Sequence, residues 1–477
     1  MNGFLRGTLW ATTLLAAVSG IALALAGCGG GGGSNNPPGA LAPTEVVQPW
    51  PLPGPFAVAC SNVVQDFNRV APGEDATSYW EGAPSGGGTP RYATDLLADP
   101  GNTLIATVTA PQDSNLYGSF AGDNVAFVVL ACYPTTDNNP RPDYPLPTGK
   151  IVPHMQIGSD APIFADPSAR YPVVAFSHGY TGSPLSDDYI SGLSVFASYG
   201  YVVIAPFHGD LRFSDLTIDN LGDAISVLSH LSNFTAMQAL RPRSISAALD
   251  LMLAHPQWQG HIDATRVGGF GASMGGETML LLGGAGLTSS YPGLAWNQVT
   301  HDPRIKAAVG YVPYFGQPFL PAFGRDQDGL DGITLPFLGI GGTADTTAPI
   351  LVTETGMSRL TGTRELVALS GVTHGFDNTS TNDIFTWALT FLDAEVRGNP
   401  ATQTQLSTMA SVAGGGDDRV AIFYNNPPGA PAPTAVVQPL PLPGPYAVAC
   451  SNVLQDFRRV GAGEDVQSYW EGKSGPP

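Results

Sequence analysis

The chain has 477 residues and carries 20 Lys and Arg side chains and 39 Asp and Glu side chains, for a formal charge of −19. This acidic balance argues against nucleic-acid binding, because a phosphate backbone is bound by clustered Lys and Arg. Hydrophobic residues make up 43% of the chain, which excludes a wholly disordered or collagen-like protein. The 59 Gly and 43 Pro residues predict many turns. An enzyme with one large domain fits best.

Residues 1–27 have the pattern of an export signal. Arg6 precedes an uncharged stretch rich in Leu and Ala, which is also long enough for a transmembrane anchor. The run Leu25-Ala26-Gly27-Cys28 resembles the bacterial lipobox, in which the Cys is acylated after cleavage. We therefore expect a lipoprotein signal peptide, a membrane anchor at Cys28 and a flexible tether over residues 28–45. The expected location is the bacterial cell envelope, with release to the exterior as an alternative.

A segment near the start of the chain is duplicated at its end. Residues 35–82 recur within residues 425–477 at an offset of 390, with 38 of 48 positions identical, and Cys60 corresponds to Cys450. Exported proteins form disulfides, and we expect Cys60 to pair with Cys132, leaving Cys450 over. The second copy is then a redundant tail, a strand that can replace the first copy by swapping, or a disulfide handle for self-association.

Apolar runs alternate with helical patterns between the two copies. After short antiparallel strands over residues 83–166, near-continuous apolar runs bounded by Gly or Pro predict buried parallel strands. These runs are residues 172–176, 201–205, 266–270, 305–311, 335–340 and 365–369, with helices expected at 244–254, 274–282 and 383–396. The alternation predicts a doubly wound, mostly parallel α/β sheet with helices on both faces. We place this domain at residues 46–424, with a helical cap inserted at about 211–243 or, as an alternative, a peripheral packing helix pair.

The strongest chemical signal is the run Gly271-Ala272-Ser273-Met274-Gly275, which follows a strand and opens a helix. This context is what a nucleophile elbow requires, because the sharp turn leaves no room for Cβ atoms beside the serine. The following helix directs its first amides at the site, so the Met274 N–H can bind an oxyanion. Ser273 is therefore the candidate nucleophile.

A serine nucleophile needs a base and a group that orients the base. His374 follows the last core strand, whereas His301 precedes a strand and is interpreted as structural. For the acid we choose Asp345, directly after the strand at 335–340, with Asp377 and Asp331 as rivals. The order Ser, Asp, His is the one this fold uses.

The loop Ser177-His178-Gly179-Tyr180-Thr181-Gly182 follows the first parallel strand and should supply the second oxyanion donor, the Tyr180 N–H. We interpret His178 as a hydrogen-bonding residue that orders this loop. The aromatic residues expected near an acyl pocket are Tyr311, Tyr314, Phe315 and Phe376. No Cys/His pattern suggests zinc, and the acidic run at 326–331 breaks the EF-hand order. No metal or cofactor is expected.

Taken together, the loop at 177–182, the run at 197–206, the Gly-x-Ser-Met-Gly-Gly elbow and the run at 345–349 resemble α/β-hydrolases. The similarity is to enzymes of the platelet-activating-factor acetylhydrolase, dienelactone-hydrolase and bacterial cutinase or polyester-hydrolase kind. It covers residues 171–399 and implies hydrolysis of small-molecule or lipid carboxylic esters through an acyl-enzyme. Two departures from polyester hydrolases are Ala272 before the serine and the long segment at 211–243. Alternatives are an acyltransferase or amidase using the same triad, or an inactive surface binding protein.

Overall fold

The computed structural model describes residues 43–61, 79, 90–146, 149–156, 160–186, 189–214, 223–291, 293–317, 322–423 and 436–437. The predicted signal peptide, Cys28, most of the tether, Cys450 and nearly all of the second copy lie outside these residues. The chain divides into two units, Met1–Gln438 and Pro439–Pro477. All described residues belong to the first unit.

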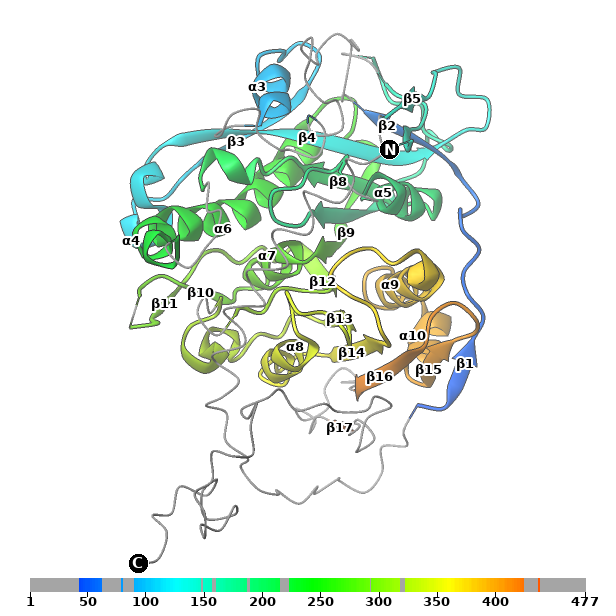
Figure 1. Cartoon of the computed structure of the whole chain (residues 1–477). Coiled ribbons are helices and arrows are strands. Elements are labelled where there is room, and N and C mark those ends of the chain that lie inside the picture. The colour runs from blue at the N-terminus through cyan, green and yellow to red at the C-terminus, as the bar shows by residue number, and fades with distance from the viewer. Residues whose placement is uncertain are drawn as a thin grey trace, which may run out of the picture. The chain divides into compact units, whose positions relative to one another are not determined.

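A mixed sheet of 11 strands forms the centre of the described part of the chain (Figure 1). Its middle is parallel and, in spatial order, consists of β8 (Val202–Pro206), β7 (Tyr171–Ser177), β9 (Ile262–Ala272), β12 (Ile305–Tyr311), β13 (Phe337–Gly342) and β14 (Arg364–Leu369). Antiparallel strands continue the sheet on both sides. Beside β8 lies β4 (Asn124–Thr135), which also pairs with β3 (Leu104–Thr109) and β2 (Ala57–Ser61). Beyond β14 follow β16 (Asp418–Phe423) and β17 (Val436–Val437). The predicted α/β class with a largely parallel sheet is confirmed. β17 lies inside the second copy, so the sheet continues past residue 424, where we had expected the domain to end.

A disulfide joins the two strands at one edge of the sheet. Cys60 of β2 stands directly opposite Cys132 of β4 in the antiparallel register, and their sulfur atoms are bonded. Both side chains are fully buried. The bond closes a loop that spans 72 residues of the chain.

The residues before β2 cross the molecule from one side of the sheet to the other (Figure 1). The strand β1 (Glu45–Val47) pairs in parallel with β15 (Met409–Val412), and residues 48–56, here called the N-terminal strap, connect β1 to β2. The Trp50 indole N–H donates to Thr390 Oγ1 at 3.2 Å. Further along the strap, the Gly54 N–H donates to Ser198 Oγ at 2.8 Å.

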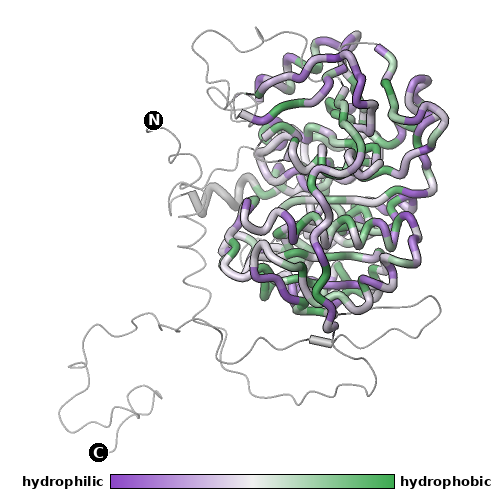
Figure 2. The backbone as a smooth tube through the Cα atoms, turned by 90° about the vertical axis from the view of Figure 1, so that its right-hand side faces the viewer, coloured by the Kyte–Doolittle hydropathy of each residue, from purple (hydrophilic) through white to green (hydrophobic). Residues whose placement is uncertain are grey.

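Helices cover both faces of the sheet. The helices α6 (Asp223–Ala254), α7 (Met274–Leu282) and α8 (Ile350–Met357) contribute to one hydrophobic core, and α5 (Tyr189–Ser198) and α9 (Thr381–Glu395) contribute to the other. The side chains of β7 alternate accordingly: Val173 and Ala175 lie in the first core, Val174 and Phe176 in the second. This alternation is the two-residue period of a strand buried on both faces. Hydrophobic residues accordingly gather inside the tube trace of Figure 2.

Shorter elements complete the fold. They are the helices α3 (Arg91–Leu97), α4 (Ser114–Tyr117) and α10 (Pro400–Leu406), the short turns η2 (Gly118–Phe120), η3 (Asp210–Arg212), η4 (Arg325–Leu330) and η5 (Asn378–Ser380), and the strand pairs β5 (Tyr144–Pro145) with β6 (Ile151–Val152) and β10 (Gly286–Thr288) with β11 (Trp296–Gln298).

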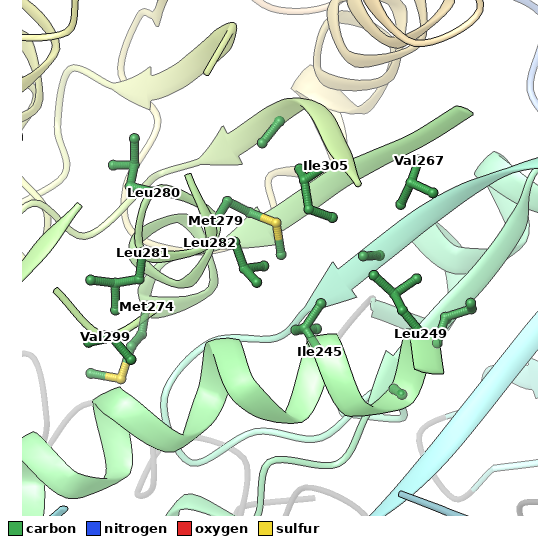
Figure 3. Close-up of a cluster of buried hydrophobic side chains, with 14 of the residues drawn as sticks. Ile245, Leu249, Val267, Met274, Met279, Leu280, Leu281, Leu282, Val299 and Ile305 are labelled. Atoms are coloured by element: carbon green, nitrogen blue, oxygen red, sulfur yellow. The ribbon is translucent and has the colours of Figure 1, made fainter. Parts of the chain in front are cut away.

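The segment predicted as a cap differs from the expectation. Residues 223–254 form the single helix α6, which joins the second half of the proposed cap to the helix expected at 244–254, with Pro242 in its interior. Met237 and Leu240 are fully buried in the core of this face, and Figure 3 shows Ile245 and Leu249 of the same helix directed toward the sheet. This half of the segment therefore packs on the sheet as part of one continuous helix, whereas the alternative predicted a helix pair. Residues 215–222 lie outside the described part of the chain.

The strand order reverses next to β7. The chain leaves β7 for β8 on one side and then crosses to β9 on the other. In open α/β sheets a crevice forms outside the carboxyl ends of the strands at such a reversal. The loops that follow β7 and β9 begin at His178 and Ser273, so both predicted site loops lie at this reversal.

Candidate active site

Ser273 occupies a strained turn between β9 and α7. Its φ and ψ are 53° and −118°, a backbone conformation that L-residues rarely adopt and that costs about 1–3 kcal/mol. The surrounding structure holds the turn, because the Ser273 N–H donates to Tyr311 O at 2.9 Å and its carbonyl accepts from the Tyr314 N–H at 2.9 Å. Such strain at a strand-to-helix turn is a feature of the nucleophile elbow.

The two glycines of the elbow are required by close backbone approaches. A Cβ atom on Gly271 would stand 2.0 Å from Gly275 O, and one on Gly275 would stand 2.0 Å from Ser177 O. Neither distance is compatible with a side chain. The motif spacing seen in the sequence therefore has a direct steric cause.

The structure brings Ser273, His374 and Asp345 into one hydrogen-bonded chain. His374 Nε2 lies 2.8 Å from Ser273 Oγ, and His374 Nδ1 lies 2.8 Å from Asp345 Oδ2. With the Nδ1 proton donated to the carboxylate, Nε2 is free of a proton and can accept the serine proton. The His374 side chain is 20% exposed, whereas that of Asp345 is fully buried. The histidine is therefore accessible from solvent, whereas the carboxylate is not.

The loop that carries Asp345 fixes the carboxylate and is tied to the histidine loop. Asp345 Oδ1 accepts from the amides of Thr347 and Ala348, both at 2.8 Å. The Ala344 N–H donates to Val372 O at 3.0 Å, two residues before His374. The rival acid Asp377 instead accepts from Thr379 and the Ser380 hydroxyl at the start of η5. Asp331 pairs with Arg359 at the surface. Only Asp345, of these three, reaches the histidine.

The loop after β7 lies against the elbow. A Cβ atom on Gly179 would stand 3.6 Å from the Ser273 Cβ, and Tyr180 is the next residue of this loop. Met274 is the first residue of α7 and follows Ser273 directly. The backbone amides of Tyr180 and Met274 therefore belong to the two segments that meet at Ser273.

His178 is buried and orders its own loop. Its Nε2 accepts from the His208 N–H at 3.1 Å, and its Nδ1 lies 2.8 Å from Gly179 O. Burial holds the pKa of His178 well below its usual value, and the nearby Arg241 lowers it further. A neutral ring with its proton on Nδ1 satisfies both contacts.

Two of the four predicted pocket residues lie beside the triad histidine. The Tyr311 hydroxyl donates to Gly375 O at 2.5 Å, and its ring lies 4.8 Å from that of Phe376. Phe376 is half-buried and also contacts Tyr189. Phe376 is therefore the half-buried ring beside His374, whereas Tyr311, which is 1% exposed, packs against it from the core.

The other two residues are placed differently. Phe315 is 1% exposed and packs between Phe323 and Phe337, so it supports the core and does not line a pocket. Tyr314 is buried below the elbow, and burial raises the pKa of its hydroxyl well above the usual value, with the nearby Glu277 adding to the effect.

Glu277 is a buried carboxyl four residues after Ser273 on α7. Gln238 donates to its Oε1 at 2.7 Å, and Oε2 has no hydrogen-bond partner among the described residues. Burial raises the pKa of Glu277 to about 8. Nothing in the sequence singles out this group, since an acidic residue in the first turn of a helix is ordinary.

A second set of residues that the sequence analysis missed lies behind the loop after β7. It consists of Ser177, His208, Asp210, Arg241 and Ser244, all of which are buried. The run Pro206-Phe207-His208-Gly209-Asp210 at the end of β8 was the available signal, because ligands of open α/β sheets bind outside the carboxyl ends of the strands.

Within the described part of the chain, no group of three His, Cys, Asp or Glu side chains is arranged to hold a metal ion, and no described helix is long and apolar enough to cross a membrane. The chain matches no protein-family model, and no curated protein matches it significantly.

Proposed function

We propose that this protein is a serine hydrolase of the α/β-hydrolase fold that cleaves carboxylic esters. The observation that carries the proposal is the chain of contacts from Ser273 through His374 to Asp345, both at 2.8 Å. It is supported by the strained turn at Ser273 and by the position of the site at the strand reversal. Oriented hydrogen bonds of this kind activate an otherwise weak nucleophile.

In the proposed reaction Ser273 Oγ attacks the ester carbonyl carbon while His374 Nε2 takes the serine proton. Asp345 stabilises the imidazolium that forms, and the amides of Tyr180 and Met274 bind the developing oxyanion. His374 then gives its proton to the leaving alcohol, and an acyl-enzyme on Ser273 remains. Water, deprotonated by His374, releases the acid by the same steps in reverse.

The substrate class within esters is inferred from the half-buried ring of Phe376, which lies two residues after His374 and packs on the buried Tyr311. Such a surface suits an apolar acyl or alkyl group. Cutinase-like hydrolysis of polyesters and platelet-activating-factor acetylhydrolase-like hydrolysis of lipids are the two alternatives. An acyltransferase or amidase would use the same triad with a different acceptor or leaving group.

For location we propose a lipoprotein of the bacterial cell envelope, anchored through Cys28. Stable anchoring requires two or more acyl chains, which lipobox processing supplies. Labelled palmitate should enter the wild-type protein and be absent from a Cys28→Ala variant. Labelling that survives the substitution would refute the anchor.

Turnover of p-nitrophenyl esters of increasing chain length tests the function. We expect wild-type turnover, a preferred chain length, and loss of at least about 1,000-fold in kcat in Ser273→Ala. The exposed Ser358 provides the matched control, and Ser358→Ala should retain full activity. A fluorophosphonate probe should label wild type but not Ser273→Ala. Absence of both turnover and labelling in wild type would refute the esterase and favour an inactive hydrolase-fold binding protein.

A further inference from the structure

Asp210 and Arg241 form a buried ion pair behind the loop that follows β7. Arg241 Nη1 lies 2.7 Å from Asp210 Oδ2, and the two side chains are 1% and 0% exposed. Asp210 begins the short turn η3 after β8, and Arg241 lies within α6. The pair therefore links two elements that are distant in sequence. Buried pairs of this kind add little net stability, because desolvation offsets the attraction between the charges.

The ion pair contacts the loop on both sides of Tyr180. Asp210 Oδ2 accepts from the Thr181 N–H at 2.8 Å, immediately after Tyr180. Arg241 Nη2 donates to His178 O, two residues before Tyr180. The peptide unit that carries the Tyr180 N–H thus lies between two points fixed by the same ion pair.

Thr181 needs this support, because its backbone is strained. Its φ is 59°, in the left-handed region that is a genuine outlier for a β-branched residue. Strain of this kind costs about 1–3 kcal/mol and persists only where the surroundings hold it. The bond from the Thr181 N–H to the buried carboxylate is the contact that can hold it here.

The opposite side of the loop is also fixed. The Gly179 N–H donates to the Tyr189 hydroxyl at 3.1 Å. A hydrogen-bonded chain connects Ser177 Oγ to His208 Nε2 at 2.8 Å, and His208 Nδ1 to Ser244 Oγ at 2.9 Å. Because Ser244 Oγ donates to Arg241 O, this chain of hydrogen bonds ends at the backbone carbonyl of Arg241.

From these contacts we infer that the Asp210–Arg241 pair is a positioning clamp that sets the Tyr180 N–H for the oxyanion. The inference rests on the proposed function, since an oxyanion arises only if Ser273 attacks a carbonyl. Neither residue touches the reacting atoms. Their effect passes through Thr181 and His178, and it should appear in the transition state more than in substrate binding.

The test compares two clamp variants with wild type. Asp210→Asn keeps an oxygen acceptor of the same shape for the Thr181 N–H, and we expect kcat to fall about tenfold with KM within about twofold. Asp210→Ala/Arg241→Met removes both halves together and should lower kcat about 100-fold, comparable to loss of one oxyanion donor. A boronic acid that forms a tetrahedral anion on Ser273 should lose affinity in parallel with kcat. A merely structural role would not produce this parallel loss.

The control is an ion pair remote from the site, in which Arg304 is partly exposed and Asp302 is buried. Arg304 contacts Asp302 at 2.6 Å just before β12, at the opposite end of the strand from the site. Arg304→Met should lower the melting temperature but leave kcat and the boronic acid affinity unchanged.

The outcomes separate this inference from the proposed function. If wild type does not turn over esters, the proposed function fails. If wild type is active, Ser273→Ala is inactive, and the clamp variants melt cooperatively with unchanged kcat and boronic acid affinity, the clamp is refuted and the esterase stands. Should the double variant fail to fold, the isosteric Asp210→Asn alone decides.

Discussion

Gly275 lies against Ser177, the last residue of β7, so closely that a Cβ atom on Gly275 would stand 2.0 Å from the Ser177 carbonyl oxygen. Ser177 ends the strand before the Tyr180 loop, and Gly275 lies in the first turn of the helix that follows Ser273. Their contact sets the distance between the start of α7 and the loop that carries Tyr180. A glycine in the second half of the elbow therefore has a geometric role beyond freeing the serine hydroxyl.

Replacing Gly275 by alanine should force these two segments apart. We expect Gly275→Ala to lose at least about 100-fold in kcat, because both proposed oxyanion donors move, and to lower stability through overpacking by about 1–3 kcal/mol or more. Ester kinetics and thermal melting measure both effects. A Cβ atom on Gly260 would meet no atom within 4 Å, so Gly260→Ala should change neither. Normal kcat in Gly275→Ala would contradict this account of the elbow.

The same substitution, Asp to Asn, tests whether Asp345 or Asp377 is the acid that orients His374. Asp345→Asn should lower kcat on the order of 1,000- to 10,000-fold, because an amide no longer holds His374 in the required tautomer. Asp377 makes its hydrogen bonds at η5, so Asp377→Asn should retain most of the activity. Steady-state kinetics of the two purified variants is the measurement. Comparable losses in both would reopen the assignment of the acid.

The disulfide between β2 and β4 should contribute stability without affecting catalysis. Its loop of 72 residues corresponds to about 4 kcal/mol in the chain-entropy description. Cys60→Ala/Cys132→Ala should therefore unfold at a clearly lower denaturant concentration, with kcat unchanged in native buffer. Cys450→Ala serves as the control and should match wild type. If the double variant is as stable as wild type, the bond does not constrain the unfolded chain as expected.

Glu277 predicts a pH dependence of stability. Its folded-state pKa of about 8 exceeds the ordinary glutamate value of 4.5, so the folded state holds the proton more tightly than the unfolded state. The resulting stabilisation is fully present below about pH 4.5 and is lost as the pH rises toward 8. Glu277→Gln should remove this loss and be more stable than wild type at pH 9, on the order of a few kcal/mol. Denaturant unfolding at pH 5, 7 and 9 measures the difference, and parallel pH profiles in the two proteins would refute it.

The parallel strands and the triad could be predicted because their signals are local. The run at 305–311 and the helix at 274–282 have the predicted bounds, since unbroken apolar residues between turn residues have few alternatives. Ser273, His374 and Asp345 each follow a predicted strand, and parallel strands bring their carboxyl ends to one edge.

Features that depend on distant contacts could not be predicted. The sequence predicted a boundary between the cap segment at 211–243 and the helix at 244–254, but α6 is continuous through Pro242, with buried residues on either side. The roles of Asp210 and Arg241 depend on a pairing across 31 positions in the chain. Neither the composition nor the spacing of the sequence indicates that pairing. The strand β16 was also missed, because its place in the sheet depends on antiparallel pairing with the distant β14.

The N-terminal strap bears on how the molecule would respond to a mechanical pull. Tension applied before residue 45 first meets the three-residue pairing of β1 with β15, and then the strap contacts that Trp50 and Gly54 make with Thr390 and Ser198. It next reaches Cys60, where the covalent bond diverts the force into β4. The strap can therefore detach first, and force applied at this end reaches the central sheet through the disulfide and β4.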